Sequence, residues 1–128
     1  MTNLQELNCK STLVKNLKPI KGLKNLKRIY LFDTNVNDLE PIEFLTNLQE
    51  LDISYTNVSN LGPIKDFTNL LKLNLNGTRI SDPDLKIITN LTNLQELFIS
   101  ETNVSDLEPI KKLISLKNFI LKKHVSQV

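Results

Sequence analysis

The chain of 128 residues repeats itself at a nearly constant interval. Residues 51–64 read LDISYTNVSNLGPI, and residues 97–110 read LFISETNVSDLEPI. Aligned on this pattern, segments of 22 or 24 residues share L-x-x-L-x-L-x-x-T-x-V-x-x-L-x-P-I-x-x-L. Such a period is typical of solenoids, in which each repeat stacks on its neighbours. The repeats begin near residues 3, 25, 47, 69, 93 and 115, which places residues 1–128 in one domain.

Alternating apolar residues in the x-L-x-L-x part of each repeat predict one short strand with a single buried face. One repeat is too short to bury that face alone, so stacked neighbours must close the core. A proline at the sixteenth position predicts a turn after the chain has left the sheet. The eleventh position, which includes Val58, is predicted to be buried.

The segment NLQELDISYTNVSNLGPIKDF resembles a leucine-rich repeat, and its 22-residue length with a Pro-Ile return resembles the bacterial internalin type. The resemblance implies an α/β fold, a right-handed solenoid of about 5.5 repeats with a concave parallel β-sheet and a convex side of 3₁₀ or short helical turns. The family usually carries Asn at the ninth position, where this chain carries only Thr. We expect a ladder of threonine hydroxyls in place of the asparagine amides.

Irregularities in the pattern carry further predictions. Repeat four is longer than its neighbours, and Asp82 as N-cap followed by Pro83 predicts a short convex helix from Pro83 to Thr89. A last segment that starts at Ser115 places Asn118 beside Glu96 and Ile120 beside Phe98. No capping element precedes the first repeat, which favours a fragment of a longer protein, end-to-end self-association through that repeat, or unusually polar edge packing.

Position three of each repeat points out of the predicted sheet and alternates in charge. Adjacent parallel strands lie about 4.8 Å apart, so each charge has opposite neighbours at contact distance. A charge ladder that supports strand pairing is the favoured interpretation, with ligand binding as the alternative. The row is Glu6, Arg28, Glu50, Lys72 and Glu96.

Positions five and seven also point outward, and position eight lies at the rim of the sheet. Of the seven aromatic residues, four fall in these columns, and Phe44, Phe67 and Phe119 fall at or near core positions. Exposed aromatics on a rigid sheet are typical anchors of protein interfaces. The alternative is that they merely cover one another. We predict a protein-binding face with Tyr30, Phe32 and Tyr55 as anchors, Asp33, Asp52, Arg79 and Glu101 as polar contacts, and Phe98 with Ile120 as a weaker second patch.

Composition argues against other classes of function. Sixteen basic and fourteen acidic residues without a block of like charge do not favour nucleic-acid binding. No stretch approaches the ~20 apolar residues of a membrane span. The only cysteine, Cys9, occupies a core column and the only histidine, His124, lies in the polar tail, so a catalytic triad or metal site lacks parts.

The sequence thus predicts a non-catalytic module that binds a protein ligand and needs no cofactor. The alternative is a structural spacer or regulatory segment of a longer protein, without a ligand of its own. The absence of a signal peptide favours a cytoplasmic location by default, and a trimmed fragment would instead be secreted or surface-exposed.

Overall fold

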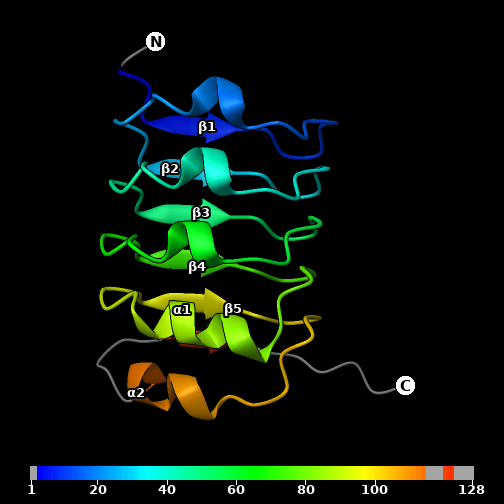
Figure 1. Cartoon of the computed structure of the whole chain (residues 1–128), viewed down its shortest axis with the longest axis vertical. Coiled ribbons are helices and arrows are strands. Elements are labelled where there is room, and N and C mark those ends of the chain that lie inside the picture. The colour runs from blue at the N-terminus through cyan, green and yellow to red at the C-terminus, as the bar shows by residue number, and fades with distance from the viewer. Residues whose placement is uncertain (1–2, 115–119, 123–128) are drawn as a thin grey trace.

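Each repeat contributes one three-residue strand to a single parallel sheet. The computed structural model describes residues 3–114 and 120–122. In Figure 1 the strands stack along the long axis of the molecule, and the helical turns form a second layer over them. The strands follow chain order and are β1 (Glu6–Asn8), β2 (Arg28–Tyr30), β3 (Glu50–Asp52), β4 (Lys72–Asn74), β5 (Glu96–Phe98) and β6 (Ile120–Lys122).

The other side of each of the first five repeats turns back through a 3₁₀ helix that contains a proline, at the predicted sixteenth position in all but repeat four. Proline suits the start of such a turn because its φ is already fixed and the turn does not need its missing N–H. The last two of these turns are extended by a short α-helix. The segments are η1 (Lys18–Ile20), η2 (Glu40–Ile42), η3 (Gly62–Ile64), η4 (Asp82–Asp84), η5 (Glu108–Ile110), α1 (Leu85–Thr89) and α2 (Lys111–Ile114).

The helix predicted from Pro83 to Thr89 is confirmed as η4 followed by α1, but its start was assigned to the wrong residue. Ser81 is the N-cap, and its backbone N–H donates to Oδ2 of Asp84 at 3.1 Å. Asp82 lies inside the 3₁₀ turn. Its carboxylate instead accepts from the backbone N–H of Ser105, at 2.8 Å, which ties repeat four to repeat five.

The core lies between the strands and the turns, and the predicted leucine columns fill it. Val58, in the eleventh column, is 0% exposed, which confirms the register of the repeat. Phe67 is also fully buried. Phe44, which was expected near the core, is 65% exposed, because Leu45 takes the buried place of that column. Among the described residues, no helix has both the length and the apolar character needed to cross a membrane.

The threonine column is largely buried, but it does not link one repeat to the next. The hydroxyl of Thr56 donates to the carbonyl of Ile53 at 2.7 Å, and that of Thr78 donates to Leu75 at 2.7 Å. These bonds lie within one repeat and satisfy a carbonyl where the chain leaves the sheet. The expected column of threonine hydroxyls that bond to the backbone is therefore present at the ninth position, but its bonds stay within each repeat.

The pairing of β6 differs from the expected register by two residues. Glu96 lies beside Ile120, and Phe98 lies beside Lys122. Paired residues of β5 and β6 are therefore 24 positions apart, as they are between β4 and β5, and not the 22 expected. Because the shift is even, it keeps the two faces of the strand in place. Phe98 and Ile120 are therefore not directly opposite one another, and the predicted patch of these two residues stays a prediction. Asn118, Phe119 and His124 lie outside the described residues.

Candidate interaction surface

The charged row at position three forms ion pairs along the sheet. Nε of Arg28 lies 2.9 Å from Oε1 of Glu6. Nζ of Lys72 lies between two carboxylates, 3.5 Å from Glu50 and 3.3 Å from Glu96. The hydrogen bond to Glu96 and the charges of both glutamates raise the pKa of Lys72. These contacts fit the favoured interpretation that the row supports strand pairing, although solvent screening keeps each of them weak.

Tyr30 lies beside this row and is half-buried. Its hydroxyl donates to Oε2 of Glu50, and Nζ of Lys10 lies 5.1 Å from the centre of its ring. Burial, followed by the hydrogen bond to Glu50 and the charge of that carboxylate, raises the pKa of Tyr30 to about 12. These contacts hold the Tyr30 side chain in place on the sheet.

Phe32 and Tyr55 are the exposed aromatic residues of the predicted face in the described part of the chain. Their ring centres lie 5.6 Å apart in an edge-to-face arrangement, and the side chains remain 37% and 45% exposed. The Tyr55 hydroxyl donates to Oε2 of Glu101 at 3.3 Å, and the charge of Glu101 is the largest cause that raises the pKa of Tyr55. The two rings touch but do not cover one another. With Gly77, over which the Tyr55 ring lies, these residues form the rim cluster: Phe32, Tyr55, Gly77 and Glu101.

Position eight, where the chain leaves the sheet, has an unusual backbone conformation. Tyr55 has a φ of 54° and Glu101 a φ of 56°, while Gly77 in the same column has 68°. This left-handed conformation costs a non-glycine residue about 1–2 kcal/mol. Bulky or charged side chains are thus retained at a site that glycine would occupy without strain. Sequence reasoning placed this column at the rim but missed its conformation, for which Gly77 was the available signal.

A small pocket lies on the concave side of the sheet and brings together three predicted site residues: Tyr30, Asp52 and Phe98. Its volume is about 230 Å³. We call it the concave pocket; it is lined by Tyr30, Glu50, Leu51, Asp52, Lys72, Leu73, Asn74 and Phe98.

The structure leaves two predicted polar residues outside this arrangement. Asp33 is exposed at position eight of its repeat and lines no part of the concave pocket. Arg79 is exposed on the loop that follows β4, where its backbone N–H donates to the carbonyl of Val58 at 2.9 Å. It belongs neither to the rim cluster nor to the concave pocket.

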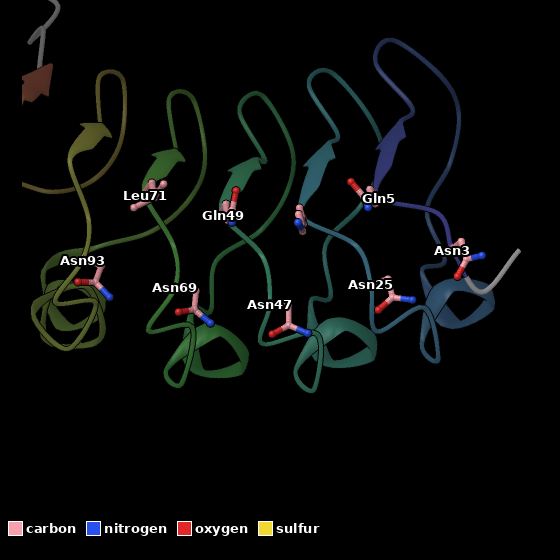
Figure 2. Close-up of a pocket in the computed structure, with 9 residues that line it drawn as sticks. Asn3, Gln5, Asn25, Asn47, Gln49, Asn69, Leu71 and Asn93 are labelled. Carbon is pink, nitrogen blue, oxygen red and sulfur yellow. The ribbon is translucent and has the colours of Figure 1, made fainter.

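A larger groove, of about 630 Å³, lies where the chain enters the strands. Figure 2 shows a row of asparagines, one at the start of each of five repeats. The amide of Asn47 donates to the carbonyl of Lys24 at 3.1 Å, and that of Asn93 donates to Thr68 at 2.7 Å. The asparagine ladder of this solenoid is therefore at the residue that precedes the first leucine of the repeat. The repeated Asn-Leu start was its signal, which sequence reasoning used only to set the register.

The described residues include no group of three or more His, Cys, Asp or Glu side chains placed to hold a metal ion. Cys9 is half-buried against the core, as its column predicts.

Comparison with known proteins identifies the repeat. Residues 46–90 match the family described as leucine-rich repeats (two copies). Internalin C2 of Listeria monocytogenes has a similar structure, with a TM-score of 0.81, 28% sequence identity, and coverage of 98% of this chain and 53% of its own. The internalin inlF of the same organism gives a TM-score of 0.89 at 26% identity, over 99% of this chain and 36% of its own.

The functional domain of InlJ, also from Listeria monocytogenes, shares the fold at a TM-score of 0.78 and 17% identity, over 99% of this chain and 27% of its own. No curated protein sequence matches the chain. The chain spans about half of the length of internalin C2, and less of the other two.

Proposed function

We propose that this leucine-rich-repeat solenoid, whose repeats are of the internalin type, binds another protein through its concave sheet and the adjoining rim. Repeat solenoids in general present extended concave surfaces for binding. The rim cluster and the concave pocket are the proposed contact regions. The module acts without catalysis, and no part of the proposal requires a cofactor.

One observation carries the proposal: Phe32 and Tyr55 are exposed aromatics that the fold holds in place. Hot spots of protein interfaces are enriched in tyrosine, and rigid aromatic rings lose little conformational entropy on binding. The Tyr55 side chain is fixed by Phe32, Glu101 and the bare backbone of Gly77. It is also kept at a strained position, and strained residues that persist often mark functional sites.

The size of the face limits how the partner binds. Six strands about 4.8 Å apart, with about four residues each, give a projected concave area of roughly 300–400 Å². A standard interface buries about 800 Å² on each partner. A tight partner would therefore also contact the loops, where Asp33 and Arg79 are exposed, or further repeats of a longer chain.

Affinity capture from the native source tests the proposal. The wild-type chain and the triple variant Tyr30→Ser, Phe32→Ser, Tyr55→Ser are immobilised, and the captured proteins are compared by quantitative mass spectrometry. Phe44→Ser is the matched control, because Phe44 is a more exposed aromatic that follows η2 on the other side of the core. We expect the triple variant to keep its circular dichroism spectrum and lose a partner that the control retains. If capture is indifferent to the triple change, the spacer or regulatory segment is the better account.

Three further predictions concern nucleic-acid binding, self-association and cellular location. Nucleic-acid binding is disfavoured and would show as a steep dependence of affinity on salt. End-to-end self-association through the first repeat, where Leu4, Leu7 and Val14 are only partly buried, would show in sedimentation. Fractionation of the native source separates the cytoplasmic location from the secreted or surface-exposed one.

A further inference from the structure

The concave pocket combines apolar walls with a carboxylate. Position five supplies one lining residue from each of four neighbouring strands: Tyr30 from β2, Asp52 from β3, Asn74 from β4 and Phe98 from β5. The two aromatics lie at the ends of this row, and Asp52 lies between them. The pocket thus offers an apolar surface and a negative charge to the same incoming group.

The charge of Asp52 is not needed for the local fold. Its Oδ1 accepts from the backbone N–H of Ser54 at 3.0 Å and from the Ser54 hydroxyl at 2.5 Å. Neighbouring repeats make the same backbone bond with a neutral amide: Asn8 accepts from Lys10 at 3.1 Å, and Asn74 accepts from Asn76 at 3.1 Å. An asparagine at position 52 would therefore serve the turn equally well. In the described part of the chain, the second oxygen of Asp52 has no hydrogen-bond partner.

The charge balance around the pocket is negative. The basic lining residue, Lys72, is shared between Glu50 and Glu96. Among the side chains that the structure describes, Asp52 has no ion pair. The whole chain has a net charge of +2, but the outward columns of β1 to β5 and their rim have the opposite balance. Their acidic residues are Glu6, Asp33, Glu50, Asp52, Glu96 and Glu101, and their basic residues are Lys10, Arg28 and Lys72.

We infer that the concave pocket receives a basic side chain, arginine or lysine, from the protein partner. This inference rests on the proposed function and specifies the chemistry of the partner at the same site. The cationic group lies at Asp52, and the apolar stem of the side chain packs between Tyr30 and Phe98. A cation against an aromatic ring is already present on this face, because Nζ of Lys10 lies 5.1 Å from the centre of the Tyr30 ring.

The test uses two small probes of the same shape and different charge. N-acetyl-arginine methylamide and its neutral analogue N-acetyl-citrulline methylamide are titrated into the isotopically labelled chain at low salt, and amide chemical shifts are followed by NMR. We expect the arginine probe to give saturable, millimolar shifts at Tyr30, Asp52 and Phe98, at least five-fold larger than those of the citrulline probe. Added sodium chloride should weaken them, because exposed charges are screened over about 10 Å at 0.1 M.

Two variants test whether Asp52 supplies the negative charge that the arginine probe contacts. Asp52→Asn keeps the acceptor that the turn requires and should reduce the response to the arginine probe at least three-fold. Asp66→Asn removes an exposed carboxylate after η3, away from the pocket, and should leave the response unchanged. Equal responses to both probes, or equal loss in both variants, would overturn the inference. Neither result bears on whether the aromatic face binds a protein, which the capture experiment decides separately.

Discussion

The ring of Tyr55 lies against the backbone of Gly77, with its Cδ1 atom 2.5 Å from the point that a β-carbon of residue 77 would occupy. The φ of Gly77 is 68°, in the left-handed region that glycine adopts without strain and that Tyr55 and Glu101 adopt at a cost in the same column. Gly77, in repeat four, therefore leaves open the space that the ring of Tyr55, in repeat three, occupies; we call this space the seat of Tyr55.

Replacing Gly77 by alanine should displace Tyr55 and strain the backbone. We expect Gly77→Ala to lower the free energy of unfolding by about 1–3 kcal/mol. The pKa of Tyr55 should also fall toward its ordinary value, because the displaced ring loses its hydrogen bond to Glu101 and lies farther from that charge. Chemical denaturation measures the first effect, and the phenolate absorbance measures the second.

Gly22→Ala is the matched control for this change. A β-carbon at Gly22 would meet nothing within 4 Å, and its φ is outside the left-handed region. We expect Gly22→Ala to be neutral or stabilising by up to about 1 kcal/mol, because alanine restricts the unfolded chain. An equal loss of unfolding free energy in Gly77→Ala and Gly22→Ala would contradict the contact between Tyr55 and the backbone of Gly77.

Glu50 should control the ionisation of Tyr30. In Glu50→Gln the negative charge beside the phenol is gone, so the pKa of Tyr30 should fall below its value of about 12, although burial still holds it above the ordinary value. The chain has two tyrosines and no tryptophan, so the change in phenolate absorbance with pH reports the ionisation of these two residues alone. The titration of Tyr30→Phe, which retains only Tyr55, shows which transition belongs to Tyr30. An unchanged upper pKa in Glu50→Gln would refute the contact.

Because folding raises the pKa of Tyr30, the free energy of unfolding should depend on pH in the alkaline range. Folding raises the pKa of Tyr30 from about 10 to about 12, so the folded chain retains a proton that the unfolded chain loses. The contribution of Tyr30 is fully present below pH about 10 and is lost as the pH rises toward about 12. Denaturation at a series of pH values should show a steeper decline for the wild type than for Tyr30→Phe.

Val58→Asp should unfold the chain. Val58 is 0% exposed, and a buried unpaired carboxylate costs several kcal/mol, a large part of the stability of a small domain. Circular dichroism and thermal denaturation measure the loss. Ser59→Asp, at the next and exposed position, should retain the wild-type spectrum and most of its stability.

Thr56→Val tests the buried threonine column. Valine preserves the shape but removes the hydroxyl that donates to the carbonyl of Ile53 at 2.7 Å, and Thr56 is only 4% exposed. We expect a loss of about 1–2 kcal/mol in the free energy of unfolding. A neutral result would mean that packing of the methyl groups, not the hydrogen bond, accounts for threonine in this column.

The sequence was sufficient to predict the repeat fold, because one pattern recurs in every segment and each copy constrains the others. The buried place of Val58 follows from that pattern alone. Phe44 was misplaced because it stands next to the last leucine column of the pattern; the pattern itself assigns that buried place to Leu45. The predicted register of β6 was wrong because the sequence pattern indicated a spacing of 22 residues from β5, whereas the paired residues are 24 apart.

The candidate site was only partly predictable for a different reason. The position of a residue in the repeat shows whether its side chain points out of the sheet. This was sufficient to predict that Phe32 and Tyr55 are exposed. The pattern does not encode contacts between columns, such as Tyr30 with Glu50 across adjacent strands. The seat at Gly77 depends on the direction of the Tyr55 side chain, which follows from the left-handed backbone of position eight. The residue types in that column, Gly77 apart, did not reveal this conformation.

Site-specific photo-crosslinking is the most direct test of the central claim, that a protein partner contacts the concave side of the solenoid. A benzophenone side chain is placed at Phe32 in one chain and at Phe44 in another, and both are irradiated in extract of the native source. We predict a discrete crosslinked protein for the Phe32 position and none for Phe44, with loss of the crosslink when Tyr55 is changed to serine. The same crosslinked product from Phe44, or no product from Phe32, would contradict the account.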